Sequence, residues 1–163
     1  EGNFTWEILE AAQARLHHWR DYAVLRHQTH DTLKDDDDKD EQDDSVSLLA
    51  GRQALVEKLN DDLDTPGALA LIDEVFSKLD HTSLDKIHRQ SLVQFIDEID
   101  EILGLDLTES TPDITDDLKR LIIQRRQARA EKNWEESDRI RDELLQAGVA
   151  VRDTPSGSIW TWK

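Results

Sequence analysis

The sequence predicts a mainly α-helical protein, in which an antiparallel four-helix bundle precedes a small unit of two helices and a β-hairpin. Apolar residues recur at three- and four-residue spacing through residues 5–103, as amphipathic helices require. A segment rich in turn formers interrupts this pattern, and short alternating strands follow near the end of the chain. We therefore expect a bundle over residues 1–105, a linker over 106–114 and a small domain over 115–163.

The first predicted helix covers residues 5–30, with Thr5 as its N-cap. Its expected buried stripe consists of Leu9, Ala12, Leu16, Trp19 and Ala23. Residues 31–44 follow, with nine acids and two lysines. Such a run cannot collapse, so it is expected to be a solvated connector, with an interaction arm as the alternative.

Three further helices complete the predicted bundle. The second runs over 45–63, and the third starts in `DTPG` with Thr65 as N-cap and Pro66 at the first helical position. The fourth starts near Ser83 and stops at Gly104. The expected inward residues are Leu48, Leu55, Leu59, Leu63, Leu69, Ile72, Val75, Phe76, Leu79, Leu84, Ile87, Leu92, Phe95, Ile96, Ile99 and Leu103.

The small domain carries clear local signals. Thr115 can cap a helix over 116–131, and Asn133 with Glu136 resembles a capping box that opens a helix at Trp134. Gly148 would close that helix. Segments 149–153 and 158–162 alternate around `TPSG`, which indicates a hairpin.

Charge is unevenly distributed along the chain, whose net charge is −17. Residues 1–114 hold 28 acids and 10 bases, a net charge of −18, and residues 115–163 hold 9 acids and 10 bases, a net charge of +1. Because acidic surfaces repel phosphates, any nucleic-acid contact should concentrate in the small domain. The chain has no Cys, which excludes disulfides and thiolate zinc sites.

Two further expectations follow from composition. No apolar run reaches the roughly 18–20 residues of a membrane span, and no signal peptide is evident, so we expect a cytoplasmic protein without membrane contact. The absence of Met indicates a processed product or a piece of a longer chain. His27 and His30 are expected to be solvated, and Asp61, Asp62 and Asp64 to support a helix N-terminus rather than a metal.

Trp134 and Asp138 are the candidate binding residues, since their i, i+4 spacing makes them neighbours on one flank of the predicted helix. An exposed indole can stack on an unpaired base, and an ionised carboxylate can accept from the two donors of guanine's pairing edge. Nearby cations could hold phosphates, with Arg125, Arg126 and Lys132 as candidates. The alternative is that Trp134 packs under the hairpin and that Arg129 pairs with Glu136 or Asp138.

The segment `ARAEKNWEESDRIRDELLQAGVAVRDTPSGSIWTW` resembles the C-terminal end of bacterial cysteinyl-tRNA synthetases. `LNDDLDTPGALALI` (59–72) is similar to part of the helical DALR domain of that family, and `GNFTWEILEAAQARL` (2–16) to the start of that domain. The chain departs from the family at Asp64, where Asn is usual, and at Ser137, where Ala is usual.

The resemblance implies the C-terminal half of a class I synthetase, with a DALR-type helical domain and an anticodon-binding domain. Its anticodon-reading residues would be Arg129, Trp134, Asp138 and Asp153, while Trp160 would build the platform. ATP and zinc are implied for a catalytic domain N-terminal to Glu1. This chain alone would then have no catalytic residues, bound metal or cofactor. The expected partners are that domain and a cysteine tRNA, with no DNA, and the expected state is a monomer.

Two alternatives stay open at this point. The helical domain of a mycothiol-pathway cysteine ligase would also fit `DDLDTPGALA`, but that enzyme should lack the Trp134 tail. A stand-alone acidic helical module that contacts other proteins is the second alternative.

Overall fold

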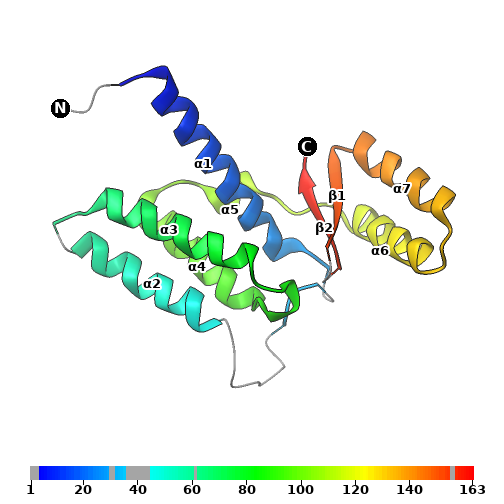
Figure 1. The fold of residues 1–163 in the computed structure, drawn as a ribbon, viewed down its shortest axis with the longest axis horizontal. Coiled ribbons are helices and arrows are strands. Elements are labelled where there is room, and N and C mark those ends of the chain that lie inside the picture. The colour runs from blue at the N-terminus through cyan, green and yellow to red at the C-terminus, as the bar shows by residue number, and fades with distance from the viewer. Residues whose placement is uncertain (1–3, 30–31, 36–44, 61, 155–156) are drawn as a thin grey trace.

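The computed structural model describes residues 4–29, 32–35, 45–60, 62–154 and 157–163. Helices are followed by one antiparallel hairpin, which confirms the predicted fold class (Figure 1). The α-helices and strands are α1 (Trp6–Val24), α2 (Ser45–Asn60), α3 (Thr65–Asp80), α4 (Arg89–Leu103), α5 (Leu107–Ser110), α6 (Asp116–Ala130), α7 (Trp134–Gln146), β1 (Val149–Thr154) and β2 (Gly157–Trp162). Short 3₁₀ helices, η1 (Leu25–His27) and η2 (Leu84–Lys86), follow α1 and precede α4.

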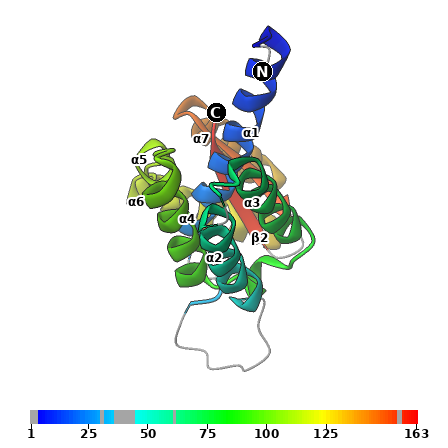
Figure 2. The same ribbon diagram turned by 90° about the vertical axis from the view of Figure 1, so that its left-hand side faces the viewer.

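Helices α2, α3 and α4 form the most closely packed part of the bundle (Figures 1 and 2). Phe76 of α3 and Phe95 of α4 are fully buried and meet edge to face, with their ring centroids 5.6 Å apart. Gly51 lets α2 approach α3, because a Cβ at that position would lie 2.8 Å from Cγ2 of Val75. The predicted inward residues of α3 and α4 therefore build one apolar core.

Helix α1 is shorter and less covered than predicted. The Thr5 side chain accepts a hydrogen bond from the backbone N–H of Ile8, which confirms it as the N-cap. Trp19 and Ala23 are buried, but Ala12 is exposed. The first half of α1 projects away from the other elements (Figures 1 and 2). The N-terminal part of the predicted apolar stripe therefore has no helix packed against it among the described residues.

Part of the predicted acidic connector packs on the bundle. Leu33 is buried, and Lys34 exchanges backbone hydrogen bonds with the segment before α4: its N–H donates to Ile87, and its carbonyl accepts from Arg89, both at 3.0 Å. The expectation of a solvated connector is therefore wrong for 32–35. Residues 31 and 36–44 lie outside the described residues.

The turn between α2 and α3 begins earlier than predicted, because α2 ends at Asn60, three residues before the predicted end at 63. Leu63, expected inward, is 73% exposed and has a left-handed φ of 57°. The N-cap of α3 is Asp64 rather than Thr65, since its carboxylate accepts from the N–H of Gly67 at 3.0 Å. Pro66 thus occupies the second helical position, where a missing N–H is also tolerated.

The segment predicted as a linker, 106–114, contains the helical turn α5. Gly104 ends α4 in the left-handed conformation, as predicted. The Asp100 carboxylate then accepts from the N–H groups of Leu107 and Thr108, at 2.7 and 2.8 Å. Because Leu107 is fully buried in the bundle core, this segment is packed rather than loose.

The small domain forms as its local signals predict. Thr115 and Asn133 cap α6 and α7 by accepting from the N–H groups of Leu118 and Glu136. The reciprocal half of the capping box is absent, because the Asn133 N–H donates to the Ala128 carbonyl at 2.8 Å. The hairpin pairs β1 with β2 from Val149↔Trp162 to Thr154↔Gly157.

The bundle and the small domain share their cores. The Gln28 amide donates to the Trp160 carbonyl and accepts from the Trp160 N–H, both at 2.9 Å. Ile159 of β2 packs in the bundle core, and Val24 of α1 packs in the core of the small domain. These contacts fix the hairpin against α1.

A polar cluster reinforces this junction. The buried Arg26 guanidinium donates to the carbonyls of Thr108 and Thr111, both at 2.9 Å. His27, expected to be solvated, is half-buried, and its Nε2 lies 3.1 Å from the Thr111 carbonyl. Burial, and secondarily the Arg26 charge, lower the pKa of His27.

This arrangement predicts that acidification weakens the junction. An unperturbed His titrates near pH 6.5, so as pH falls the unfolded chain binds this proton before the folded protein does. The free energy of unfolding should therefore fall as pH drops through about 6.5, and the decline should stop below the folded pKa. Urea unfolding of wild type and His27→Gln from about pH 8 to about pH 5.5 checks this. The substitution should flatten the profile, whereas His17→Gln, at an exposed position of α1, should not. Equal profiles for both variants would contradict the prediction.

Candidate nucleic-acid interface

Trp134 lies open to solvent at the first residue of α7. Its side chain is 55% exposed, and Asp138, one turn along, is also exposed. The indole that fills the core between the hairpin and the two helices is Trp160 of β2, which is fully buried. The alternative in which Trp134 packs under the hairpin is therefore wrong, and the indole is available to a ligand.

Arg129 of α6 connects the indole to the hairpin. Its guanidinium carbon lies 5.6 Å from the centroid of the Trp134 ring, within the range of a cation–π interaction. One of its terminal nitrogens lies 3.4 Å from the Asp153 carboxylate. The described contacts thus pair Arg129 with Asp153 rather than with Glu136 or Asp138.

Arg125 has a structural task instead of the predicted phosphate contact. Its side chain is only 4% exposed, and its two terminal nitrogens donate to the two Asp153 oxygens at 2.7 and 2.9 Å. The Ser158 hydroxyl also donates to Asp153, at 2.7 Å. These donors hold the Asp153 pKa far below its usual range, so the carboxylate stays ionised. A phosphate cannot reach a guanidinium so buried.

The spacing of Arg125 from its apolar neighbours indicates in the sequence that this side chain is buried. It lies three residues after Ile122 and three before Ala128, both buried, so it occupies the apolar stripe of α6. A cation in such a stripe requires an internal partner. The predicted phosphate contact treats Arg125 as a surface charge and leaves out this requirement.

The other predicted cations differ in availability. Lys132 is exposed in the turn between α6 and α7, with a left-handed φ of 60°. Arg126 is half-buried on α6. Arg120, a further cation of α6 that was not among the predicted contacts, pairs with Asp117 at 3.1 Å. Lys132 is therefore the most accessible of the three predicted phosphate contacts.

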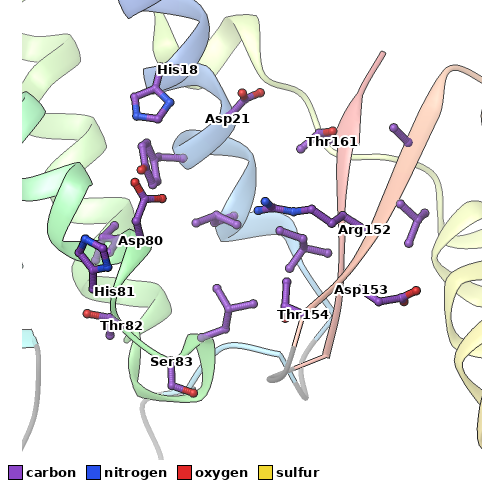
Figure 3. A pocket seen from close by; sticks show the side chains of 17 residues that line it. His18, Asp21, Asp80, His81, Thr82, Ser83, Arg152, Asp153, Thr154 and Thr161 are labelled. Carbon is purple, nitrogen blue, oxygen red and sulfur yellow. The ribbon is translucent and has the colours of Figure 1, made fainter.

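A separate cleft of about 880 Å³ lies between α1, the end of α3 and the hairpin (Figure 3). Arg152 points into it toward α1, whereas Asp153, the next residue of β1, points the other way toward α6. Asp21 and Asp80 line the same cleft. Two carboxylates beside one guanidinium make this a poor phosphate site, which leaves the Trp134 surface as the better candidate.

The described residues provide no metal centre and no membrane span. Among them, no three His, Asp or Glu side chains are grouped to hold a metal ion. No helix in the same residues is long and apolar enough to cross a bilayer.

Comparison with known proteins identifies relatives of the chain that carries this surface. Residues 111–160 match the family of the cysteinyl-tRNA ligase anticodon binding domain. The chain is 28% identical to the cysteine–tRNA ligase of Brevibacillus brevis over 99% of its own length. It is 33% identical to that of Campylobacter concisus over 67% of its length, and 28% identical to that of Finegoldia magna over 78%. The resemblance drawn from the sequence motifs is thereby confirmed.

The matches cover only part of each relative. The chain spans 36% of the Brevibacillus brevis protein, 28% of the Finegoldia magna protein and 26% of the Campylobacter concisus protein. The matched family segment includes α6, α7 and nearly all of the hairpin, and therefore Arg129, Trp134 and Asp138.

The buried Ser137 of α7 generates a stability prediction. It is 1% exposed, and its hydroxyl has no hydrogen-bond partner among the described residues. A buried polar group without a partner costs about 1–3 kcal/mol, so Ser137→Ala should raise the free energy of unfolding by about 1 kcal/mol. Urea denaturation measures the change. Ser77→Ala, on the exposed face of α3, controls for helix propensity. An equal gain in both variants would show that burial of the hydroxyl carries no cost.

Proposed function

We propose that residues 111–160, which belong to the cysteinyl-tRNA ligase anticodon binding domain family, bind the anticodon loop of a tRNA and read a guanine there. One observation carries the proposal: the Trp134 indole is 55% exposed at the first residue of α7, with Arg129 against its ring. Asp138 lies one turn further along the same helix, within the matched segment.

The chemistry of these side chains suits an unpaired purine. Stacking of a base on an aromatic ring contributes roughly 1–3 kcal/mol. The Asp138 carboxylate is an acceptor only, and guanine presents two adjacent N–H donors on its pairing edge. Adenine presents one donor and one acceptor there, so it would meet a carboxylate less well. Trp134 would thus supply affinity for any base, and Asp138 would supply the preference for guanine.

The activity of the whole protein is part of the proposal. By analogy with its relatives, the protein would attach cysteine to tRNA with ATP, and a catalytic domain outside this chain would perform the reaction. The zinc of that reaction does not fit this chain, which has no Cys and no suitable group of ligands among its described residues. A cysteine tRNA as the partner, a monomeric state and a cytoplasmic location belong to the same proposal.

The match of residues 111–160 favours this function over the two alternatives. The mycothiol-pathway ligase should lack the Trp134 tail, and here that tail is the segment that matches an anticodon binding family. A stand-alone protein-interaction module would not account for a match of residues 111–160 to an anticodon binding family.

Substitution of the indole tests the contact directly. Trp134→Ala should weaken binding of a cysteine tRNA transcript by roughly 5- to 150-fold, the equivalent of 1–3 kcal/mol of lost stacking. Fluorescence anisotropy at low salt measures the affinity. Trp6→Ala removes an indole that is 72% exposed at the far end of α1 and should leave binding unchanged. If both variants bind like wild type, Trp134 does not contact the RNA.

Substitution of the carboxylate tests the base preference. Asp138→Asn should reduce the discrimination between transcripts with guanine and adenine at the first anticodon position by about tenfold, since an amide can also donate to adenine. Asp142→Asn removes the same charge from an exposed position of α7 and should preserve the discrimination. A parallel loss in both variants would mean that charge alone is responsible.

A further inference from the structure

We infer that Asp153 is a positioning residue: it holds Arg129 against one face of the Trp134 ring, so that a base stacks on the opposite face. The inference rests on the proposed function for its use, but the arrangement itself exists without RNA. The inferred role of Asp153 differs from the role that the family resemblance implies, in which Asp153 reads the anticodon directly.

Three internal hydrogen bonds and one ion pair engage the Asp153 carboxylate. One oxygen accepts from Arg125 at 2.7 Å and from Ser158 at 2.7 Å. The other accepts from Arg125 at 2.9 Å and faces Arg129 at 3.4 Å. An ionised carboxylate offers about four lone-pair sites, and three of them accept these hydrogen bonds, while the Arg129 charge faces the second oxygen. A base that approached the second oxygen would have to compete with Arg129.

Arg125 and Ser158 fix the carboxylate in place. The Arg125 side chain is 4% exposed and binds Asp153 in the two-point geometry that sets both distance and orientation. Ser158 lies opposite Asp153 in the hairpin register and adds the bond from the second strand. Asp153 therefore has one defined orientation, with its second oxygen turned toward α6.

Arg129 depends on that orientation. Its side chain is 39% exposed, and a free arginine of this kind would sample many rotamers. The contact with Asp153 restricts it to a position in which its guanidinium carbon also lies 5.6 Å from the centroid of the Trp134 ring. One side of the indole is thus backed by a cation, and the ring loses freedom before any RNA arrives.

An RNA-free measurement tests the chain of contacts from Asp153 to Trp134. The full chain is labelled with 5-fluorotryptophan, and the ¹⁹F resonance of Trp134 is assigned by its disappearance in Trp134→Phe. Asp153→Asn should shift this resonance, because the guanidinium is no longer held at the ring. Asp117→Asn breaks the surface pair with Arg120 and should leave it in place. An unshifted Trp134 resonance in Asp153→Asn would overturn the inference.

A double-mutant cycle with a cysteine tRNA transcript tests the consequence for binding. Asp153→Asn should weaken binding about tenfold in the wild-type background, a loss comparable to that of one weak stacking interaction. In the Trp134→Ala background the same substitution should have less than about a twofold effect. Equal losses in both backgrounds would show that Asp153 acts on the RNA without Trp134, and would refute the positioning role.

The two measurements separate the possible failures. If no variant and no wild-type protein binds the transcript, the proposed function fails, but the fluorine spectrum still decides whether Asp153 positions the ring. If circular dichroism shows that Asp153→Asn is unfolded, Arg129→Lys replaces it, since that side chain keeps its charge but loses the planar guanidinium. A shifted Trp134 resonance and weaker binding in Arg129→Lys support the inference. Unchanged values of both overturn it.

Discussion

The small domain depends on one buried cation. Arg125 lies in the apolar stripe of α6, where an unpaired guanidinium would be very unfavourable, and Asp153 of β1 supplies the partner. This pair joins the helix pair to the hairpin, two units that would be too small to be stable separately. The hairpin is fixed in turn to α1 by the Gln28 amide and by Ile159 in the bundle core. The position of Trp134 relative to the bundle therefore depends on two sets of contacts: those that fix the hairpin to α1, and the Arg125–Asp153 pair that fixes the helix pair to the hairpin.

The features that the sequence predicted well are those decided by near neighbours in the chain. Thr115 and Asn133 cap their helices because a side-chain oxygen can reach an N–H only three residues away. The hairpin follows from alternation around a turn. The angle between Trp134 and Ile140 places Trp134 on a flank of its helix, but the exposure of the indole is decided by the packing of the hairpin. Leu63 is a residue at which helical periodicity gives the wrong prediction. It continues the helical spacing, but the chain has already turned into a left-handed conformation.

The features that the sequence did not predict are pairings between distant segments. Gln28 and Trp160 are separated by 132 positions, and Arg125 and Asp153 by 28. Periodicity indicates which face of a helix is buried, but not which group faces it. His27 illustrates the difference, because its neighbours in the sequence suggested solvent, whereas Thr111, just after α5, and Trp160 of the hairpin lie against it in the fold. The burial and the partners of a polar residue at a junction depend on how the helices and strands pack, which the sequence pattern does not specify.

The charges of the small domain indicate how the interface would work. Several of its cations are engaged by internal or neighbouring acids: Lys119 with Asp113, Arg120 with Asp117, Arg125 with Asp153, and Arg139 with Glu136 and Glu143. Few positive charges therefore remain to hold phosphates, and the acidic bundle would repel them. Under the proposed function, this surface would contribute selectivity through the Asp138 carboxylate and only the affinity of one stacking ring. Tight binding would then come from linkage to further RNA contacts elsewhere in the whole protein, since tethered sites gain from a raised effective concentration.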